Sequence, residues 1–155
     1  MIFILAVGQR QPEWVNDAVV DYLNRFPENQ RPRLKEIKAE PRTSGKLVAG
    51  LMQAEADRLR AAIPKDSVVI ALDEHGKIVS TQEFAKILEK LEQAAPNVVF
   101  LIGGPDGLDS RLKSESQQIL RLSSMTLPHG MARVLLAEQL YRARSLMNHH
   151  PYHRA

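Results

Sequence analysis

The sequence predicts an α/β fold in which helices cover both faces of a mostly parallel sheet. Two continuous apolar runs, 68–72 (VVIAL) and 98–102 (VVFLI), contain no alternating polar residues. Such runs are typical of strands that are buried on both faces. Strand-like and helical patterns also alternate along the chain in the order β-α-β-α-β-α-β, which favours helices packed on a parallel sheet. The chain has 155 residues and no visible linker or repeat, so we expect one domain.

The strands and loops of the first part of the chain follow from short local signals. Residues 2–7 are predicted as a buried strand, and Gly8 with Pro12 marks the turn after it. Residues 33–38 are predicted as a second strand, although their two apolar residues do not alternate. The polar segment 40–46 is predicted to be a mobile loop, because it contains Pro41, Arg42, Thr43, Ser44 and Gly45.

Four helices are predicted from apolar residues that recur three or four positions apart. The first, which Pro27 stops, carries Val15, Val19, Tyr22, Leu23 and Phe26. The second carries Val48, Met52, Ala56, Leu59 and Ile63. The crossover helix between the two apolar runs carries Phe84, Ile87, Leu88 and Leu91. The last helix begins at Pro128, which suits the first helical position, and its apolar arc consists of Ala132, Leu135, Leu136, Leu140, Ala143, Leu146 and Met147.

The excess positive charge lies in the last 27 residues. This stretch has four arginines, four of the five histidines and one acid, which leaves 17 basic and 17 acidic side chains for residues 1–128. A basic terminus on a neutral domain predicts a surface that binds a polyanion. The absence of cysteine excludes a disulfide framework and a thiolate zinc site, and it suits the cytoplasm. The apolar start is too short for a signal peptide or a membrane span, so no membrane association is expected.

Two loops follow the central strands, where ligands bind in parallel sheets. They are Leu72-Asp73-Glu74-His75-Gly76-Lys77 and Gly103-Gly104-Pro105-Asp106-Gly107. Paired glycines let a ligand lie against bare backbone, although a tight turn from strand to helix explains them equally well. Neither loop matches a dinucleotide fingerprint or a phosphate-binding loop, so the sequence does not support a nucleotide site of those kinds.

A third loop, residues 122–127, precedes the last helix and offers backbone groups to a purine edge. His129 would then lie in the first turn of that helix, where the positive helix end keeps an imidazole neutral. The alternative is that His129 only caps or packs the helix. Farther along, Glu138 and Arg142 are four residues apart and can pair, while Arg133 and Arg144 lie along another face that is either solvated or binds phosphate.

The terminal HHPYH places three imidazoles within five residues. We do not predict a metal site there, because Pro151 forces a turn and no carboxylate follows. Tyrosine, histidine and arginine together are better suited to phosphate contact and to stacking on an unpaired base.

Several motifs occur together in the chain. They are Leu-Ile-Gly-Gly-Pro-Asp-Gly-Leu at 101–108, Thr-Leu-Pro-His at 126–129 leading into Arg-Val-Leu-Leu-Ala-Glu-Gln-Leu-Tyr-Arg-Ala at 133–143, and Pro-Tyr-His-Arg at 151–154. Ala-Val-Gly at 6–8 and Tyr-Leu-Asn-Arg-Phe-Pro at 22–27 accompany them. These motifs resemble the RlmH family, the large-subunit ribosomal RNA pseudouridine N3-methyltransferases, which are minimal members of the SPOUT class. The resemblance covers the whole chain.

The resemblance implies one SPOUT domain over residues 1–155, with a C-terminal trefoil knot and the cofactor site in about 68–155. It implies a homodimer that binds S-adenosylmethionine and methylates a pseudouridine in helix 69 of 23S ribosomal RNA, within the assembled 70S ribosome. The implied cofactor contacts are Leu72, Gly103, Gly104, Leu122, Ser123, Ser124, Met125, Thr126 and Leu127. The implied catalytic and RNA-facing residues are His129, Arg142, Tyr152, His153 and Arg154. His149 and Arg144 depart from the pattern of some relatives, which affects expected RNA contacts only.

Methyl transfer from a sulfonium needs an aligned acceptor and no metal. A uracil-type N3 must lose its proton, either to a neutral histidine or to solvent after an arginine stabilises the anion. Our hypothesis assigns Arg142 and Arg154 to the anion and His129 or His153 to the proton. Two other functions remain open: a ribosome-binding factor without enzymatic activity, and a SPOUT enzyme that acts on another RNA. Which subunit supplies each residue is also open.

Overall fold

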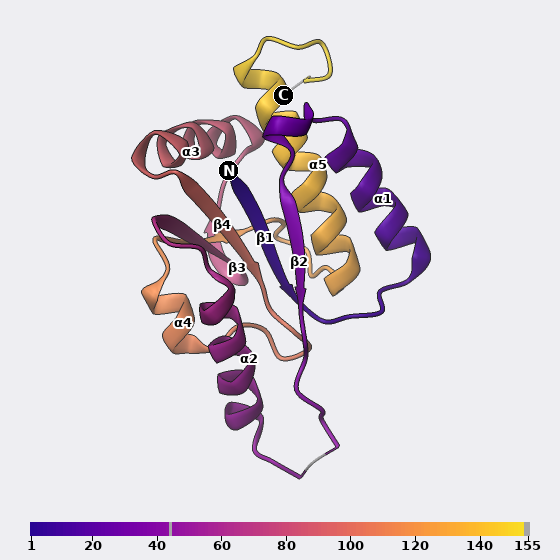
Figure 1. Ribbon diagram of the computed structural model, residues 1–155, viewed down its shortest axis with the longest axis vertical. Helices are drawn as coiled ribbons and strands as arrows, with labels where there is room; N and C mark the ends of the chain where they lie inside the picture. The colour runs from indigo at the N-terminus through magenta and orange to yellow at the C-terminus, as the bar shows by residue number, and fades with distance from the viewer. Residues whose placement is uncertain (44, 154–155) are drawn as a thin grey trace.

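Five parallel strands form the central layer of the protein, in the order β2-β1-β4-β3-β5 (Figure 1). The computed structural model describes residues 1–43 and 45–153. The strands are β1 (Ile2–Val7), β2 (Arg33–Ile37), β3 (Ser67–Ile78), β4 (Asn97–Ile102) and β5 (Gln118–Arg121). All of their pairings are parallel, which confirms the predicted α/β class.

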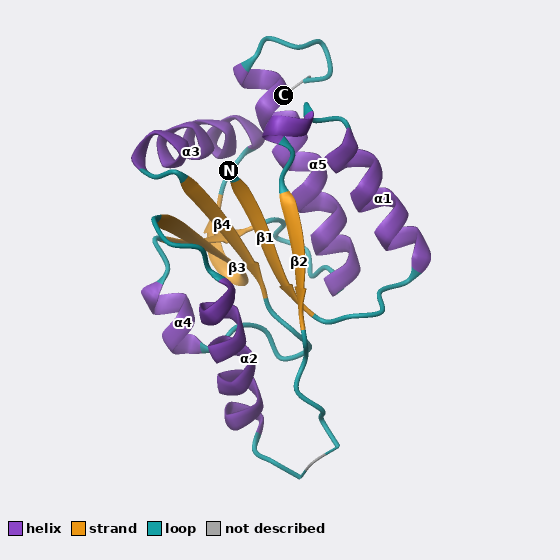
Figure 2. Cartoon of the chain, viewed as in Figure 1, coloured by secondary structure: helices purple, strands orange, loops and turns teal. Residues whose placement is uncertain are grey.

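Helices cover both faces of this sheet (Figure 2). One face carries α1 (Glu13–Asn24), α3 (Thr81–Ala94) and α5 (His129–Met147), and the other carries α2 (Val48–Ala62) and α4 (Ser110–Glu115). Strand residues alternate between two cores, because successive side chains of a strand point to opposite faces. In β1, Ile4 and Ala6 pack in the core under α1, α3 and α5, while Leu5 and Val7 pack in the core under α2 and α4.

The sequence did not predict β5, α4 or the short 3-10 helix η1 (Glu28–Gln30). β5 has only four residues and α4 only six, so neither is long enough to show a hydrophobic period. α4 begins where the Asp109 side chain accepts hydrogen bonds from the backbone N–H groups of Arg111 and Leu112. This N-cap is the one local signal that marks the helix.

β3 continues to Ile78, although the sequence analysis placed a loop after Leu72. Leu120 of β5 lies opposite both Leu72 and Lys77, so residues 73–76 bulge out around β5. A Cβ atom on Gly76 would lie 2.6 Å from the carbonyl carbon of Leu120. Only glycine therefore lets the two backbones approach this closely.

α5 packs against both α1 and α3, and its apolar arc forms the middle of one core. Leu136, Leu140 and Ala143 are fully buried, as the spacing predicted. Pro128 is the N-cap of α5 rather than its first helical residue, because its ψ of 155° is extended. In the described part of the chain, no helix combines the length and the apolar character that a membrane span requires.

Candidate active site

The bulge of β3 after Leu72 and the loops that follow β4 and β5 meet at the carboxyl edge of the sheet. A cavity of about 760 Å³ lies there, and its wall includes Leu72, Gly103, Gly104, Thr126 and Leu127. A smaller cavity of about 120 Å³ adjoins it and is lined by Leu72, Leu122, Ser123, Met125, Thr126 and Leu127. Eight of the nine predicted cofactor residues thus border one continuous crevice, and Ser124 lines neither cavity. The volume of the larger cavity is within the range of ordinary small-molecule sites.

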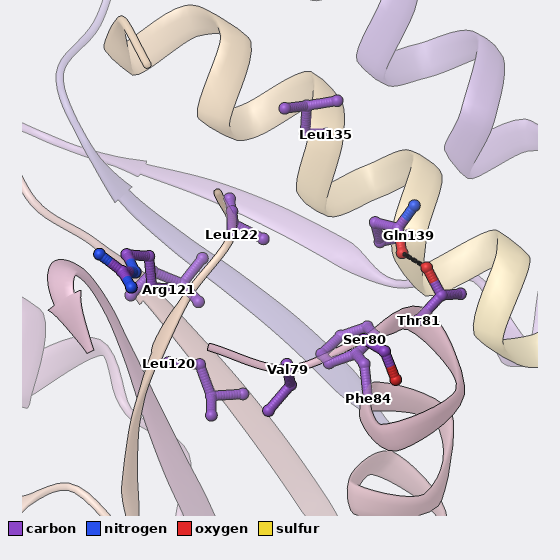
Figure 3. Close-up of a pocket in the computed structure, with 10 residues that line it drawn as sticks. Val79, Ser80, Thr81, Phe84, Leu120, Arg121, Leu122, Leu135 and Gln139 are labelled. Carbon is purple, nitrogen blue, oxygen red and sulfur yellow. Dashed lines mark hydrogen bonds between the residues drawn. The ribbon is translucent and has the colours of Figure 1, made fainter. Parts of the chain in front are cut away.

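A third cavity, of about 190 Å³, extends the crevice between β5 and the start of α3 (Figure 3). Leu72 and Leu122 line it as well, and Arg121 lies on its rim. On its other side, the Thr81 hydroxyl donates to Oε1 of Gln139 at 2.8 Å. The sequence analysis missed this wall, because residues 79–81 and 139 carry no local signal that relates them to the loop after β5.

The glycines of the 103–107 turn are required by the turn itself. A Cβ on Gly103 would lie 2.5 Å from the carbonyl carbon of Gly107, and the φ of Gly107 is +83°. The Gly107 N–H closes the turn by donating to the Gly104 carbonyl at 3.0 Å. The turn interpretation of these residues is therefore confirmed, and the same turn forms one wall of the larger cavity.

Carboxylates predominate on the wall of the larger cavity. Asp73, Glu74, Asp106 and Asp109 line it, whereas Lys113 is the only lysine or arginine among the described residues that line it. Three of the four carboxylates have a cationic partner: Asp73 lies 3.3 Å from Lys113, Asp106 lies 3.0 Å from Arg42, and Asp109 lies 4.0 Å from Arg60. Glu74 has no lysine or arginine partner among the described residues, so it is the carboxylate of this wall that favours a cationic ligand over a phosphate.

Arg42 connects the segment predicted to be mobile to the turn after β4. Its guanidinium lies 2.6 Å from Glu55 of α2 and 3.0 Å from Asp106 of the turn. Glu55 is only 2% exposed and also accepts a hydrogen bond from the Glu40 backbone at 2.9 Å. These ion pairs hold Arg42 at the border of the crevice, and no local sequence pattern predicts them.

His129 lies at the first turn of α5, beside the same crevice. Its Nε2 accepts a hydrogen bond from Nε of Arg133 at 2.7 Å, so the ring proton is on Nδ1, which donates to the Gly103 carbonyl at 2.9 Å. The pKa of His129 is lowered, first by burial and then by the neighbouring Arg133 charge. The ring is neutral, as predicted, but the main cause is burial rather than the helix end.

Arg133 is only 1% exposed, so the expectation that it lies on a solvated or phosphate-binding face was wrong. It pairs with Glu36 at 2.7 Å. Arg142 pairs with Glu138 as predicted, and Arg144 pairs with Glu92 of α3. Each arginine of the basic terminus that the structure describes therefore has a carboxylate partner, which reduces the predicted positive surface.

Residues after α5 fold back onto its last turns. The Tyr152 hydroxyl donates to Oε1 of Glu138 at 3.0 Å, and the Arg142 guanidinium lies 4.8 Å from the Tyr152 ring centre. Burial, followed by the Glu138 contact, raises the pKa of Tyr152 to about 12. Nδ1 of His153 is buried and has no hydrogen-bond partner among the described residues. Arg154 lies outside the described residues.

Aromatic contacts extend this C-terminal cluster, by which we mean Glu138, Arg142, Tyr152 and His153, to α1. The Arg25 guanidinium lies 4.7 Å from the ring centre of Tyr22 and 5.6 Å from that of Tyr152. The sequence analysis assigned no role to Arg25, because more than a hundred residues separate it from Tyr152.

The structure divides the predicted catalytic residues between two ends of α5. His129 and Arg142 are 13 residues apart in one straight helix, which places them roughly 20 Å apart along its axis. Figure 1 shows the C-terminal segment at the end of the molecule opposite to the loops after the strands. Within one protomer, the C-terminal cluster therefore does not reach the crevice. In the part of the chain that is described, no group of three or more acidic or histidine side chains is arranged to hold a metal ion.

Comparisons with known proteins agree with this geometry. The sequence model of a family described as "Predicted SPOUT methyltransferase" matches residues 1–153. The chain is 53% identical to "Ribosomal RNA large subunit methyltransferase H" of Bordetella pertussis (strain Tohama I), over 99% of each chain. It is 49% identical to the protein of the same name from Burkholderia ambifaria (strain MC40-6), also over 99% of each. A solved structure of a probable methylase family protein from Haemophilus influenzae Rd KW20 has the same fold, with a TM-score of 0.60 at 15% identity over 96% of this chain and 68% of that chain.

Proposed function

The chain belongs to the SPOUT methyltransferase family, and from this premise we propose that it methylates ribosomal RNA of the large subunit in the cytoplasm. The methyl donor is S-adenosylmethionine. The proposed acceptor is N3 of a pseudouridine in helix 69 of 23S ribosomal RNA, within the assembled 70S ribosome. The observation that carries the proposal is the meeting of the β3 bulge and the loops after β4 and β5 in one crevice at the carboxyl edge of the sheet.

The shape and charge of the crevice support a sulfonium cofactor. Leu72, Leu122 and Leu127 offer apolar surface to an adenine ring, and the loop of residues 122–127 offers backbone groups to its edge. Glu74, the wall carboxylate without a lysine or arginine partner among the described residues, complements the positive charge of the donor. When bound, the cofactor supplies an electrophilic methyl group, and the enzyme must mainly align the acceptor nitrogen with it.

The C-terminal cluster suits the acceptor side of the reaction. The guanidinium of Arg142 stays charged, because the Glu138 hydrogen bond raises its pKa further, so it can stabilise a uracil-type anion. Nδ1 of His153 has no hydrogen-bond partner among residues 1–43 and 45–153, whereas both ring nitrogens of His129 have partners, so His153 is the better candidate for taking the N3 proton. Arg154 is proposed as a second anion-stabilising group.

The distance between the crevice and the C-terminal cluster supports a homodimer. If two copies pack their α1 and α5 surfaces in antiparallel fashion, the C-terminal cluster of one copy lies beside the crevice of the other. Trp14 of α1 is 55% exposed in the single chain, so it is available for such a contact. A twofold contact that covers Trp14 on both copies would build two identical composite sites.

A trefoil knot is the remaining part of the proposal. Residues 73–76 bulge around β5, and the chain then continues from β5 through the loop of residues 122–127 into α5. This course supports threading of the C-terminal segment through the loop that follows β3. We propose that residues 68–155 form the knotted part of one domain and bind the cofactor there.

Isothermal titration calorimetry with S-adenosylmethionine, followed by transfer of a labelled methyl group to 70S ribosomes, tests the function. The Gly103→Ala variant should bind the cofactor poorly, because a Cβ there collides with Gly107. Gly50→Ala is the matched control, since a Cβ at Gly50 meets no atom within 4 Å. An absence of cofactor binding by the wild-type protein would leave a ribosome-binding factor as the function. Mass spectrometry of ribosomal RNA from a deletion strain identifies the modified nucleotide, and an unchanged helix 69 would point to another RNA.

A further inference from the structure

The side chain of Arg133 connects three segments that are far apart in the sequence. Nη1 donates to Glu36 of β2 at 2.7 Å, Nη2 donates to the Gly8 carbonyl at 2.8 Å, and Nε donates to His129 at 2.7 Å. Because the guanidinium is planar, these three directions are fixed relative to one another. A change at any one partner therefore alters the geometry at the other two.

His129 transmits this geometry to the crevice. With Nε2 held by Arg133, the imidazole ring directs its Nδ1–H at the Gly103 carbonyl, 2.9 Å away. Gly103 has no freedom to compensate, because it already lies against the backbone of Gly107. The position of the 103–107 turn thus depends on the orientation of the His129 ring.

Building on the proposed function, we propose that Glu36, Arg133 and His129 form a positioning relay that holds the 103–107 turn in the conformation that binds the cofactor. Glu36 is the outer anchor of the relay. It lies near the end of the edge strand β2, its side chain is 37% exposed, and it does not line any of the cavities of the crevice described above. His129 is then a positioning residue and does not remove the acceptor proton.

The relay also predicts a response to acid. Protonation of His129 at Nε2 would set an N–H donor against the N–H of Arg133, and the contact between them would be lost. The groups that face the ring are Arg133, whose charge opposes protonation, and the Gly103 carbonyl and Glu36, which favour it. Burial opposes protonation most strongly, so the relay is intact at neutral pH and breaks only in acid.

The Glu36→Gln variant tests the proposal, because it keeps the size of an exposed side chain and removes only its charge. We expect S-adenosylmethionine to bind about tenfold more weakly to this variant, as measured by calorimetry on the full-length protein, while ribosome binding is unchanged. Glu115→Gln is the matched control: Glu115 is a partly exposed carboxylate that also accepts from an arginine, Arg60, but lies outside the relay. Wild-type affinity in Glu36→Gln would overturn the relay.

Two substitutions of His129 separate the relay from a simple contact with Gly103. The asparagine amide can donate from near the Nδ1 position but is too short to place its oxygen at the Nε2 position for Arg133. The glutamine amide can place its oxygen at the Nε2 position but no donor near the Nδ1 position. The relay requires both hydrogen bonds of His129, so both variants should bind the cofactor weakly. Their cofactor affinity should also no longer fall when the pH is lowered. Wild-type cofactor affinity in His129→Asn would overturn it.

Nuclear magnetic resonance can measure the pKa of His129, which would not change if the role of Glu36 were purely structural. Since Glu36 raises the pKa of His129, that pKa should fall in Glu36→Gln, and an unchanged value would contradict the coupling. Failure of the relay can be told apart from failure of the proposed function, because in the second case the wild-type protein itself would not bind S-adenosylmethionine.

Discussion

The hydroxyl of Tyr152 donates to Oε1 of Glu138 at 3.0 Å, which ties the segment after α5 to the helix that precedes it. The same carboxylate oxygen accepts from Nε of Arg142 at 2.8 Å. Glu138 is 9% exposed, and its second oxygen accepts from Gln139 at 2.7 Å. One buried carboxylate therefore orders both the cation and the phenol of the C-terminal cluster.

The Tyr152→Phe variant should transfer the methyl group more slowly while it retains cofactor binding. The aromatic ring stays in place above Arg142, and only the bond to Glu138 is removed, so the free energy of unfolding should fall by about 1 kcal/mol. We expect a slower single-turnover rate on ribosomes and an unchanged dissociation constant for S-adenosylmethionine. A rate equal to that of the wild type would remove Tyr152 from the catalytic assignment.

Tyr152 also predicts a loss of stability in alkali. Its pKa is raised from 10.0 to about 12 in the folded chain, so the folded state retains the phenol proton more strongly than the unfolded state does. The corresponding stability is fully present below about pH 10 and is lost as the pH rises towards 12. Urea denaturation measures the free energy of unfolding across this pH range, and the ultraviolet absorbance of tyrosinate is a second probe. The free energy of unfolding should fall less steeply with pH in Tyr152→Phe than in the wild type. Identical declines would contradict the assigned pKa.

Gly76→Ala should destabilise the fold by several kcal/mol or prevent folding. Its Cβ would lie 2.6 Å from the Leu120 backbone, which cannot move without displacing β5. Gly50→Ala, in α2, has open space and should raise the free energy of unfolding by about 0.5–1 kcal/mol. Urea denaturation of both variants measures the contrast, and equal stabilities would mean that β5 does not pass Gly76 closely.

Arg42→Gln should lower the free energy of unfolding by about 3 kcal/mol, because it leaves the buried Glu55 carboxylate without its ion partner. The double variant Arg42→Gln with Glu55→Gln should recover part of this loss, since no charge is then buried. A double-mutant cycle by chemical denaturation measures the coupling. Additive effects would show that the Arg42 and Glu55 contact contributes nothing specific.

Mixed dimers test whether two subunits build each site. A heterodimer of a Gly103→Ala chain and an Arg142→Ala chain contains one intact composite site only if the C-terminal cluster of one copy serves the crevice of the other. Activity should therefore return when the two inactive variants are refolded together. If activity stays absent although heterodimers form, each chain uses its own C-terminal cluster.

Local sequence patterns were sufficient for much of the fold and for one part of the candidate site. The apolar runs at 68–72 and 98–102 became the central strands β3 and β4, and the arc of α5 became core, because burial of apolar residues imposes a period that is visible within a few residues. The rule that ligands bind at the carboxyl ends of parallel strands pointed to the segments after the two central strands, and the resemblance to the RlmH family supplied nine expected cofactor contacts, of which eight line the crevice.

Only the tertiary structure decided the contacts between distant segments. Arg133 and Glu36 are 97 residues apart, and a helical wheel placed Arg133 on an outer face because it contains no information about β2. The bulge around β5 at Gly76, the burial of Glu55 and the separation of His129 from the C-terminal cluster have the same origin. Hydrophobic period is a property of neighbouring residues, whereas ion pairs and backbone approaches depend on which segments the folded sheet brings together.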